Sequence, residues 1–258
     1  MRVGGEIMRL ISRCNPDMEF NSFLQEPSCK NEVEYQRLLK VFGVVEKAVH
    51  QRVFTSQHTV GVDDISILEN RFFGASPRRY LGTEKSVKQE HHDGAPDIVI
   101  SQNNFVLAVD HFRFDCAKWT RKGSPLQAFL SKHRDQVSSL SGNELIEFVR
   151  SNGIRCSEKD YVENLSKMIK AKVEKTSRYF KALDCYLVEE DRTKQKELWL
   201  FAEDILPIGD IDLVISEVLR QFDAHPKLAG VIYARNAMPF VISENIDDIR
   251  FIYNRNSA

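Results

Sequence analysis

The sequence predicts an α/β protein in which helices flank a mixed central sheet. Apolar residues make up 42% of the 258 residues, which is enough to form one large core. Segments with the helical period alternate along the chain with short apolar runs typical of strands. This order of helix, strands, helix, strands, helix and strand is typical of layered α/β domains.

The N-terminal part is expected to contain an extended arm followed by a helix. Residues 1–30 hold scattered prolines and polar residues, which favours an irregular arm. Residues 31–54 carry apolar side chains at three- and four-residue steps, which predicts a helix. Asn31 and Glu34 have the spacing of a capping box at its start.

The rest of the chain follows the same two periods. A strand or a short helix is expected at 65–73, and a loop at 74–82. The further predicted elements are helical patterns at 125–139, 143–151, 158–181 and 210–223, and strands at 96–101, 104–114, 183–189, 197–201, 228–234 and 249–253. We interpret residues 31–258 as one domain, with the polar stretch 117–157 as a helical insertion over one end of the sheet.

Two neighbouring predicted strands are apolar, and each contains one aspartate in its apolar segment. Asp97 lies at the start of the strand 96–101, and Asp110 lies near the end of the strand 104–114. Adjacent strands are about 4.8 Å apart, so acids on them can share a divalent cation. The pair therefore predicts a metal site.

Pro96-Asp97, twelve intervening residues and Asp110 resemble the PD-(D/E)XK phosphodiesterase superfamily, which has the restriction-endonuclease-like fold. In that family the two acids hold Mg²⁺, and a lysine two residues after the second acid helps to position or activate water. The resemblance covers roughly residues 31–114 and 158–190. It implies a restriction-endonuclease-like core, Mg²⁺ or Mn²⁺ as cofactor, and DNA rather than RNA as the substrate. It also suggests Glu90 as an additional metal ligand.

The chain departs from this pattern at the lysine, because Phe112 stands two residues after Asp110. The predicted helix at 158–181 offers replacements, since Lys172 falls near the middle of its apolar stripe and Lys175 at the edge. Some branches of the family move the lysine to this helix. Lys175 and Tyr179 also match the Gln-x-x-x-Tyr spacing of certain exonuclease branches, which makes Tyr179 a candidate substrate contact. The alternative is that both lysines extend along the apolar surface to reach water.

Other polar groups were weighed beside the acid pair. Residues 90–93, Glu-His-His-Asp, come just before the first acidic strand, and His92 is a candidate for a substrate-side loop or a metal ligand. The candidate phosphate contacts are Arg78, Arg79, Lys118, Arg121 and Lys122, although solvated loop residues have the same pattern. His111 is expected to face away from Asp110 by strand alternation and to be a core residue. Glu34 and Glu46 are candidates for a glutamate from the first helix.

Composition limits the function classes. A net charge of −1 counts mildly against tight non-specific nucleic-acid binding as the main task. Five scattered cysteines without a C-x-x-C pair argue against a zinc knuckle and a disulfide framework. No apolar run approaches the ~20 residues of a membrane span, and no signal peptide is visible. We therefore expect a cytoplasmic protein without a membrane partner.

Two functions remain open. The first is a metal-dependent nuclease that acts on DNA. The second is an inactive nuclease-like fold that binds nucleic acid or protein, with Phe112 marking the lost site. A homodimer is compatible with both.

Overall fold

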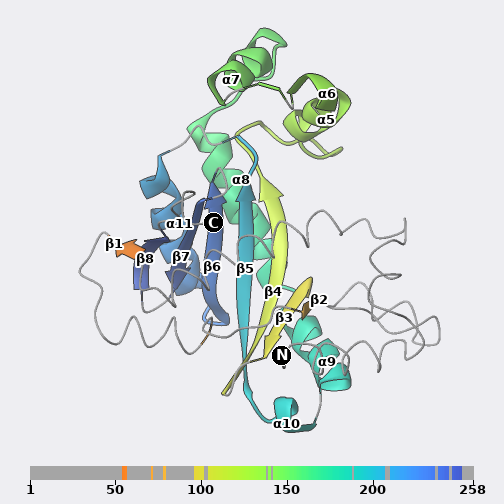
Figure 1. The fold of residues 1–258 in the computed structure, drawn as a ribbon, viewed down its shortest axis with the longest axis vertical. Coiled ribbons are helices and arrows are strands. Elements are labelled where there is room, and N and C mark those ends of the chain that lie inside the picture. The colour runs from red at the N-terminus through yellow and green to blue at the C-terminus, as the bar shows by residue number, and fades with distance from the viewer. Residues whose placement is uncertain are drawn as a thin grey trace, which may run out of the picture.

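The structure is a computed structural model that describes residues 54–56, 71, 78–79, 96–101, 104–137, 139–140, 142–187, 189–206, 210–235, 238–243 and 246–251. Its strands form one eight-stranded sheet in the order β1-β8-β7-β6-β5-β4-β3-β2 (Figure 1). The neighbours β4, β5 and β6 are parallel, and the other neighbouring pairs are antiparallel. The predicted α/β class with a mixed sheet and flanking helices is confirmed.

The elements have the following bounds. The strands are β1 (Phe54–Ser56), β2 (Arg78–Arg79), β3 (Ile98–Ser101), β4 (Phe105–Phe114), β5 (Gln195–Asp204), β6 (Leu228–Arg235), β7 (Met238–Ser243) and β8 (Ile246–Phe251). The helices are α5 (Pro125–Lys132), α6 (Arg134–Val137), α7 (Gly142–Ser151), α8 (Glu158–Val173), α9 (Thr176–Tyr186), α10 (Glu189–Arg192) and α11 (Ile211–Ala224). Among the described residues, no helix is both long and apolar enough to cross a lipid bilayer.

The main core lies between the sheet and the helices α8 and α11, which pack against each other on one face (Figure 1). Alternate residues of each strand point to this face because side chains in a strand have a period of two. The core side chains from β4 are Val106, Ala108, Phe112 and Phe114, and those from β5 are Leu198, Leu200 and Ala202. Asp110 occupies the same alternating series and is therefore a carboxylate on a core-facing row.

The opposite face of the sheet is also apolar and buried. Leu107 and Val109 of β4 and Phe201 of β5 are at most 1% exposed. Trp199 packs across β6 at Gly230, where a Cβ atom would lie 2.3 Å from the indole ring, so a glycine is needed there. Arg71 contacts this region through Glu197, with Nη2 2.6 Å from Oε1.

The helices α5, α6 and α7 stand beyond the end of β4 as a separate group (Figure 1). The two predicted helical patterns in this stretch are confirmed, but the first is broken at His133 into α5 and α6. Ser124 caps α5 by accepting a hydrogen bond from the backbone N–H of Gln127, and Pro125 takes the predicted first position.

The prediction of one long helix at 158–181 was wrong in its extent. The helix α8 ends at Val173, and the chain re-enters a helix at Thr176. The Lys175 N–H donates a hydrogen bond to the Lys172 carbonyl in a tightened turn. The Thr176 hydroxyl donates a hydrogen bond of 2.5 Å to the Val173 carbonyl. The local side-chain hydrogen bond therefore competes with the helical ladder.

The prediction of a strand at 183–189 was also wrong, since α9 runs to Tyr186 and α10 follows. The buried residues Tyr179, Ala182, Leu183 and Leu187 are spaced by three and four, which is the helical period. The strand β7 was not predicted, and Arg78 and Arg79 form β2 where a loop was expected. Both are short strands that exist because a neighbouring strand pairs with them.

Several predictions lie largely outside the described residues. These include the arm at 1–30 and the helix at 31–54, of which only Phe54 is described and belongs to β1. By contrast, the predicted strands corresponding to β3, β4, β5, β6 and β8 and the helix corresponding to α11 are confirmed, with ends that differ by a few residues.

Candidate functional site

The antiparallel pair β3 and β4 brings the two predicted acids together. Ile98 pairs with Val109, and this register places Asp97 opposite Asp110. The side chain of Asp97 accepts a hydrogen bond from the backbone N–H of His111 at 2.7 Å, which uses the edge of β4 just beyond the paired residues. Asp110 is 3% exposed. Two acids from adjacent strands therefore face each other at a nearly buried position.

A lysine from α8 completes the group. The Nζ atom of Lys172 lies 2.9 Å from Oδ2 of Asp110, and 17% of the lysine side chain is exposed. The Tyr179 hydroxyl, from α9, donates a hydrogen bond to the same oxygen. Lys172 thus lies on the sheet side of α8, as its place in the apolar stripe predicted, and it reaches an acid rather than water.

The two carboxyl groups have opposite titration behaviour. Burial, together with the hydrogen bond to Asp110 and its charge, raises the pKa of Asp97 to about 7. Burial also acts to raise the pKa of Asp110, but the hydrogen bond with Asp97, the Lys172 charge and the Tyr179 hydroxyl outweigh it and hold that pKa below its usual value. The pair therefore shares its protons unequally, with Asp110 as the more acidic of the two carboxyl groups.

The position of the missing motif lysine is filled by the core. Phe112 is 3% exposed and packs with Phe114 at a centroid distance of 6.2 Å. As predicted from alternation, Phe112 shares a face with Asp110, whereas His111 points to the other face. There His111 is 5% exposed, stacks on Phe201 and has Nε2 3.3 Å from Oε2 of Glu203. Its expected place in the core is confirmed.

Of the other predicted site residues, only Tyr179 joins this group, and in a different role from the one predicted. Lys175 is the residue before α9, and within the described part of the chain it forms no ion pair with either aspartate. Tyr179 was predicted to contact substrate, but its hydroxyl is engaged by Asp110. The backbone of Arg78 and Arg79 pairs with Val99 and Ile98, one strand away from β4. Glu34, Glu46, Glu90 and His92 lie outside the described residues.

A second buried acid was not anticipated. Asp204, at the end of β5, accepts hydrogen bonds from the hydroxyls of Tyr161 on α8 and of Tyr233 on β6, the latter at 2.7 Å. Burial raises the pKa of Asp204 despite these bonds. The sequence signal was weak, because three residues so distant in the chain share no local spacing.

The acid pair has the donor chemistry of a hard-cation site. Carboxylate oxygens are the ligands that Mg²⁺ and Mn²⁺ prefer, and Mg²⁺ is commonly held by one or two carboxylates together with water and substrate phosphates. Among the described residues no third acid, histidine or cysteine joins the pair. Burial is the main cause of the raised pKa of Asp97, and the Asp110 carboxylate adds to it; a cation between the two acids would offset the contribution of that second charge.

Comparison with known proteins adds no relative: no protein-family model, no curated protein and no solved structure matches the chain.

Proposed function

We propose that this protein is a metal-dependent phosphodiesterase that cleaves DNA, with Asp97, Asp110 and Lys172 as its catalytic residues. The supporting observation is the 2.9 Å contact between Lys172 of α8 and Asp110, on the face that Asp110 shares with Phe112. Phe112 occupies the strand position where the family motif has its lysine. Lys172 of the helix α8 instead brings an ammonium group to Asp110. The succession of β2, β3, β4, α8 and β5 supports a restriction-endonuclease-like core, with β4 and β5 parallel.

The proposed division of labour follows from the charges. Asp97 and Asp110 would hold one Mg²⁺ or Mn²⁺, which polarises the scissile phosphate and lowers the pKa of a bound water. Asp97 must lose its proton for this, and its pKa of about 7 allows that near neutral pH. Asp110 is already ionised and is oriented by the Tyr179 hydroxyl.

Lys172 supplies positive charge beside the acids. Its ammonium group has three N–H donors, of which the Asp110 contact uses one. The remaining donors are available to orient the attacking water or to neutralise charge that develops on the phosphate. Because the side chain is partly exposed, it can meet a substrate that reaches the two carboxylates.

The test is calorimetry with Mn²⁺ and with Mg²⁺ on the whole chain, followed by a plasmid-cleavage assay. We expect binding to the wild type and none to the double variant Asp97→Ala/Asp110→Ala, and we expect cleavage to require the metal and both acids. Equal cleavage by wild type and double variant would overturn the assignment. Circular dichroism of the variant separates loss of the site from loss of the fold.

A non-catalytic module is the second candidate, and two observations favour it. Asp110 is nearly buried with Oδ2 already engaged by Lys172 and Tyr179, and Phe112 belongs to the core. A wild type that binds DNA or a protein but neither metal, with DNA present or absent, would identify this function instead.

A further inference from the structure

The charges of this chain are separated along the sequence. Residues 117–181, which include the insertion and α8, contain 14 Lys and Arg against 7 Asp and Glu, a net charge of +7. The rest of the chain contains 22 against 30, a net charge of −8, and the two sums give the overall −1. The near-neutral total therefore hides a basic region that continues directly from the strand bearing Asp110.

The part of that region that contains no acid is residues 118–134, the basic segment. It holds five basic residues and no acid: Lys118, Arg121, Lys122, Lys132 and Arg134. All five are exposed, and none forms an ion pair with another described residue. Charges of one sign held without counter-charges repel each other, and a bound polyanion would neutralise that repulsion.

The tip of the basic segment is a tight turn. Thr120 and Gly123 exchange two backbone hydrogen bonds of 3.0 Å, and Arg121 and Lys122 lie between them. Gly123 has φ +98°, a conformation that favours glycine. The turn fixes both basic residues on one short backbone loop.

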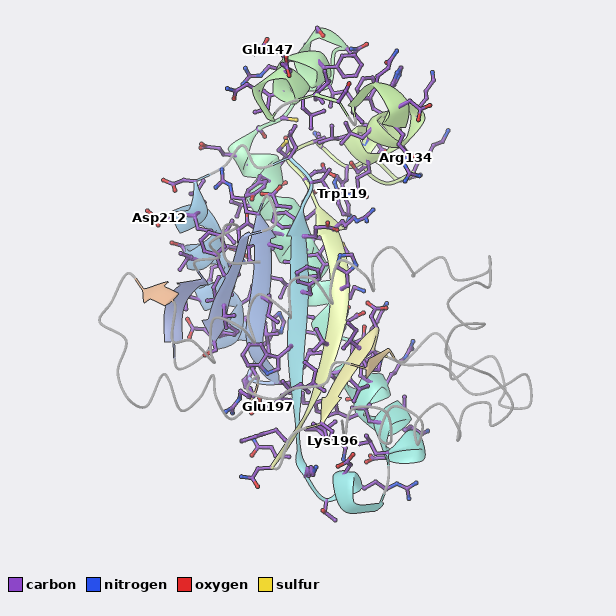
Figure 2. The ribbon with its side chains drawn as sticks, in the orientation of Figure 1. Trp119, Arg134, Glu147, Lys196, Glu197 and Asp212 are labelled. Carbon is purple, nitrogen blue, oxygen red and sulfur yellow. The ribbon has the colours of Figure 1, made fainter. Side chains whose placement is uncertain are left out.

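The base of this loop is held to the sheet by buried polar groups. Asp115, which is fully buried, accepts hydrogen bonds from the Ala117 N–H at 2.9 Å, from the Trp119 indole at 3.2 Å and from Gln127 at 3.0 Å. Asn164 of α8 donates to the carbonyls of Asp115 and Ala117, each at 2.8 Å. The positive charges are thus presented from a fixed platform (Figure 2 shows Trp119 at the end of β4 and Arg134 on the helices beyond).

We infer that the basic segment binds the phosphate backbone of DNA while a DNA strand is cleaved at the site formed by Asp97 and Asp110. This inference rests on the proposed function. Asp110 and Phe114 are four strand residues apart, or about 13 Å at ~3.3 Å per residue, and the platform follows at once. One turn of duplex spans about 34 Å, so one DNA molecule can reach both places.

The composition of the segment favours nucleic acid over a lipid surface. Its large apolar residues are turned inward: Leu126 is fully buried, and Phe129 and Leu130 pack on the core. Binding to an anionic membrane by an interfacial helix uses exposed apolar side chains next to basic ones. The outer surface of this segment offers charge, which matches an array of phosphates.

The experiment measures binding without cleavage. Fluorescence anisotropy in EDTA follows the whole chain on a labelled duplex of about 20 base pairs, roughly two helical turns, between about 50 and 200 mM KCl. Arg121→Glu should weaken binding about tenfold and reduce the slope of log affinity against log salt by about 1. The matched control is Lys227→Glu, an exposed lysine between α11 and β6 with the same charge change, which should bind like wild type.

Single-stranded DNA, RNA and phosphatidylserine vesicles are measured in parallel. Equal affinity of Arg121→Glu and wild type, or wild-type binding to vesicles but to no nucleic acid, would overturn the inference. Binding that depends on Arg121 in a protein that never cleaves supports the surface and rejects only the nuclease. Cleavage that requires Asp110 but is unchanged in Arg121→Glu supports the nuclease and rejects the basic segment as the DNA-binding surface.

Discussion

Two buried aspartates face the same core from neighbouring strands, and their polar neighbours differ. Asp110 of β4 contacts a lysine, a tyrosine and a second carboxylate, whereas Asp204 of β5 contacts two tyrosines and the backbone N–H of Leu206. The pKa of Asp110 is lowered and that of Asp204 is raised. Burial acts to raise both pKa values. The hydrogen bond with Asp97, the Lys172 charge and the Tyr179 hydroxyl together outweigh burial at Asp110, whereas the groups around Asp204 do not outweigh it there.

The largest difference is expected when each aspartate is replaced by asparagine. Asp110→Asn should lower metal-dependent cleavage by about 10³-fold or more, because several kcal/mol of metal stabilisation is lost and each 1.36 kcal/mol is tenfold. Asp204→Asn should leave cleavage within a few fold and change stability by about 1 kcal/mol. Single-turnover rates and urea denaturation of both variants check this. Equal losses of cleavage would show that the two acids do not differ in role.

Removing the lysine should expose the cost of a buried unpaired charge. Lys172→Met is expected to lower the free energy of unfolding by about 3 kcal/mol and cleavage by ~10²-fold or more. The double variant Asp110→Asn/Lys172→Met should regain most of the stability but no activity, since no uncompensated charge remains. Lys170→Met, on the exposed side of α8, is the matched control and should change stability by at most about 0.5 kcal/mol. A double variant no more stable than Lys172→Met would contradict the ion pair.

Tyrosine-to-phenylalanine substitutions compare the two clusters at a single hydroxyl. Tyr179→Phe removes a hydrogen bond to a charged acceptor and should cost about 1.5–3 kcal/mol, together with a change in metal affinity. Tyr233→Phe, at Asp204, should cost about 1 kcal/mol and leave metal affinity unchanged. Thermal denaturation with and without Mn²⁺ separates these effects, and an equal metal response in both variants would argue against the distinction.

A separate effect is the pH dependence that Asp97 introduces. Since its folded pKa of about 7 exceeds the unfolded value, the folded protein binds the proton more tightly, and stability falls as pH rises from about 4 to 7. Metal competes with that proton, so Mn²⁺ affinity should rise up to about tenfold per pH unit below pH 7 and level off above it. Asp97→Asn should remove this part of the stability profile. Calorimetry in buffers of different ionisation enthalpy measures the released proton, and the absence of release would contradict the proposal.

Local sequence patterns were sufficient to predict the α/β class, most strands of the sheet and three residues of the candidate site, Asp97, Asp110 and Lys172. The period of two placed Asp110 on a row with Phe112 and opposite to His111, and the helical period placed Lys172 on the inward stripe of α8. These are local properties of the backbone, and so they can be read from spacing alone.

The contacts among these residues depend on long-range packing. The helix α8 ends before Lys175, and most of the expected strand at 183–189 is helical. The Tyr179 hydroxyl donates a hydrogen bond to Asp110. Long-range packing also brings together Tyr161, Asp204 and Tyr233 from three elements with no common spacing. The physical reason is that helix breaks, short paired strands and buried polar clusters depend on partners far away in the chain, whose positions local periodicity does not contain.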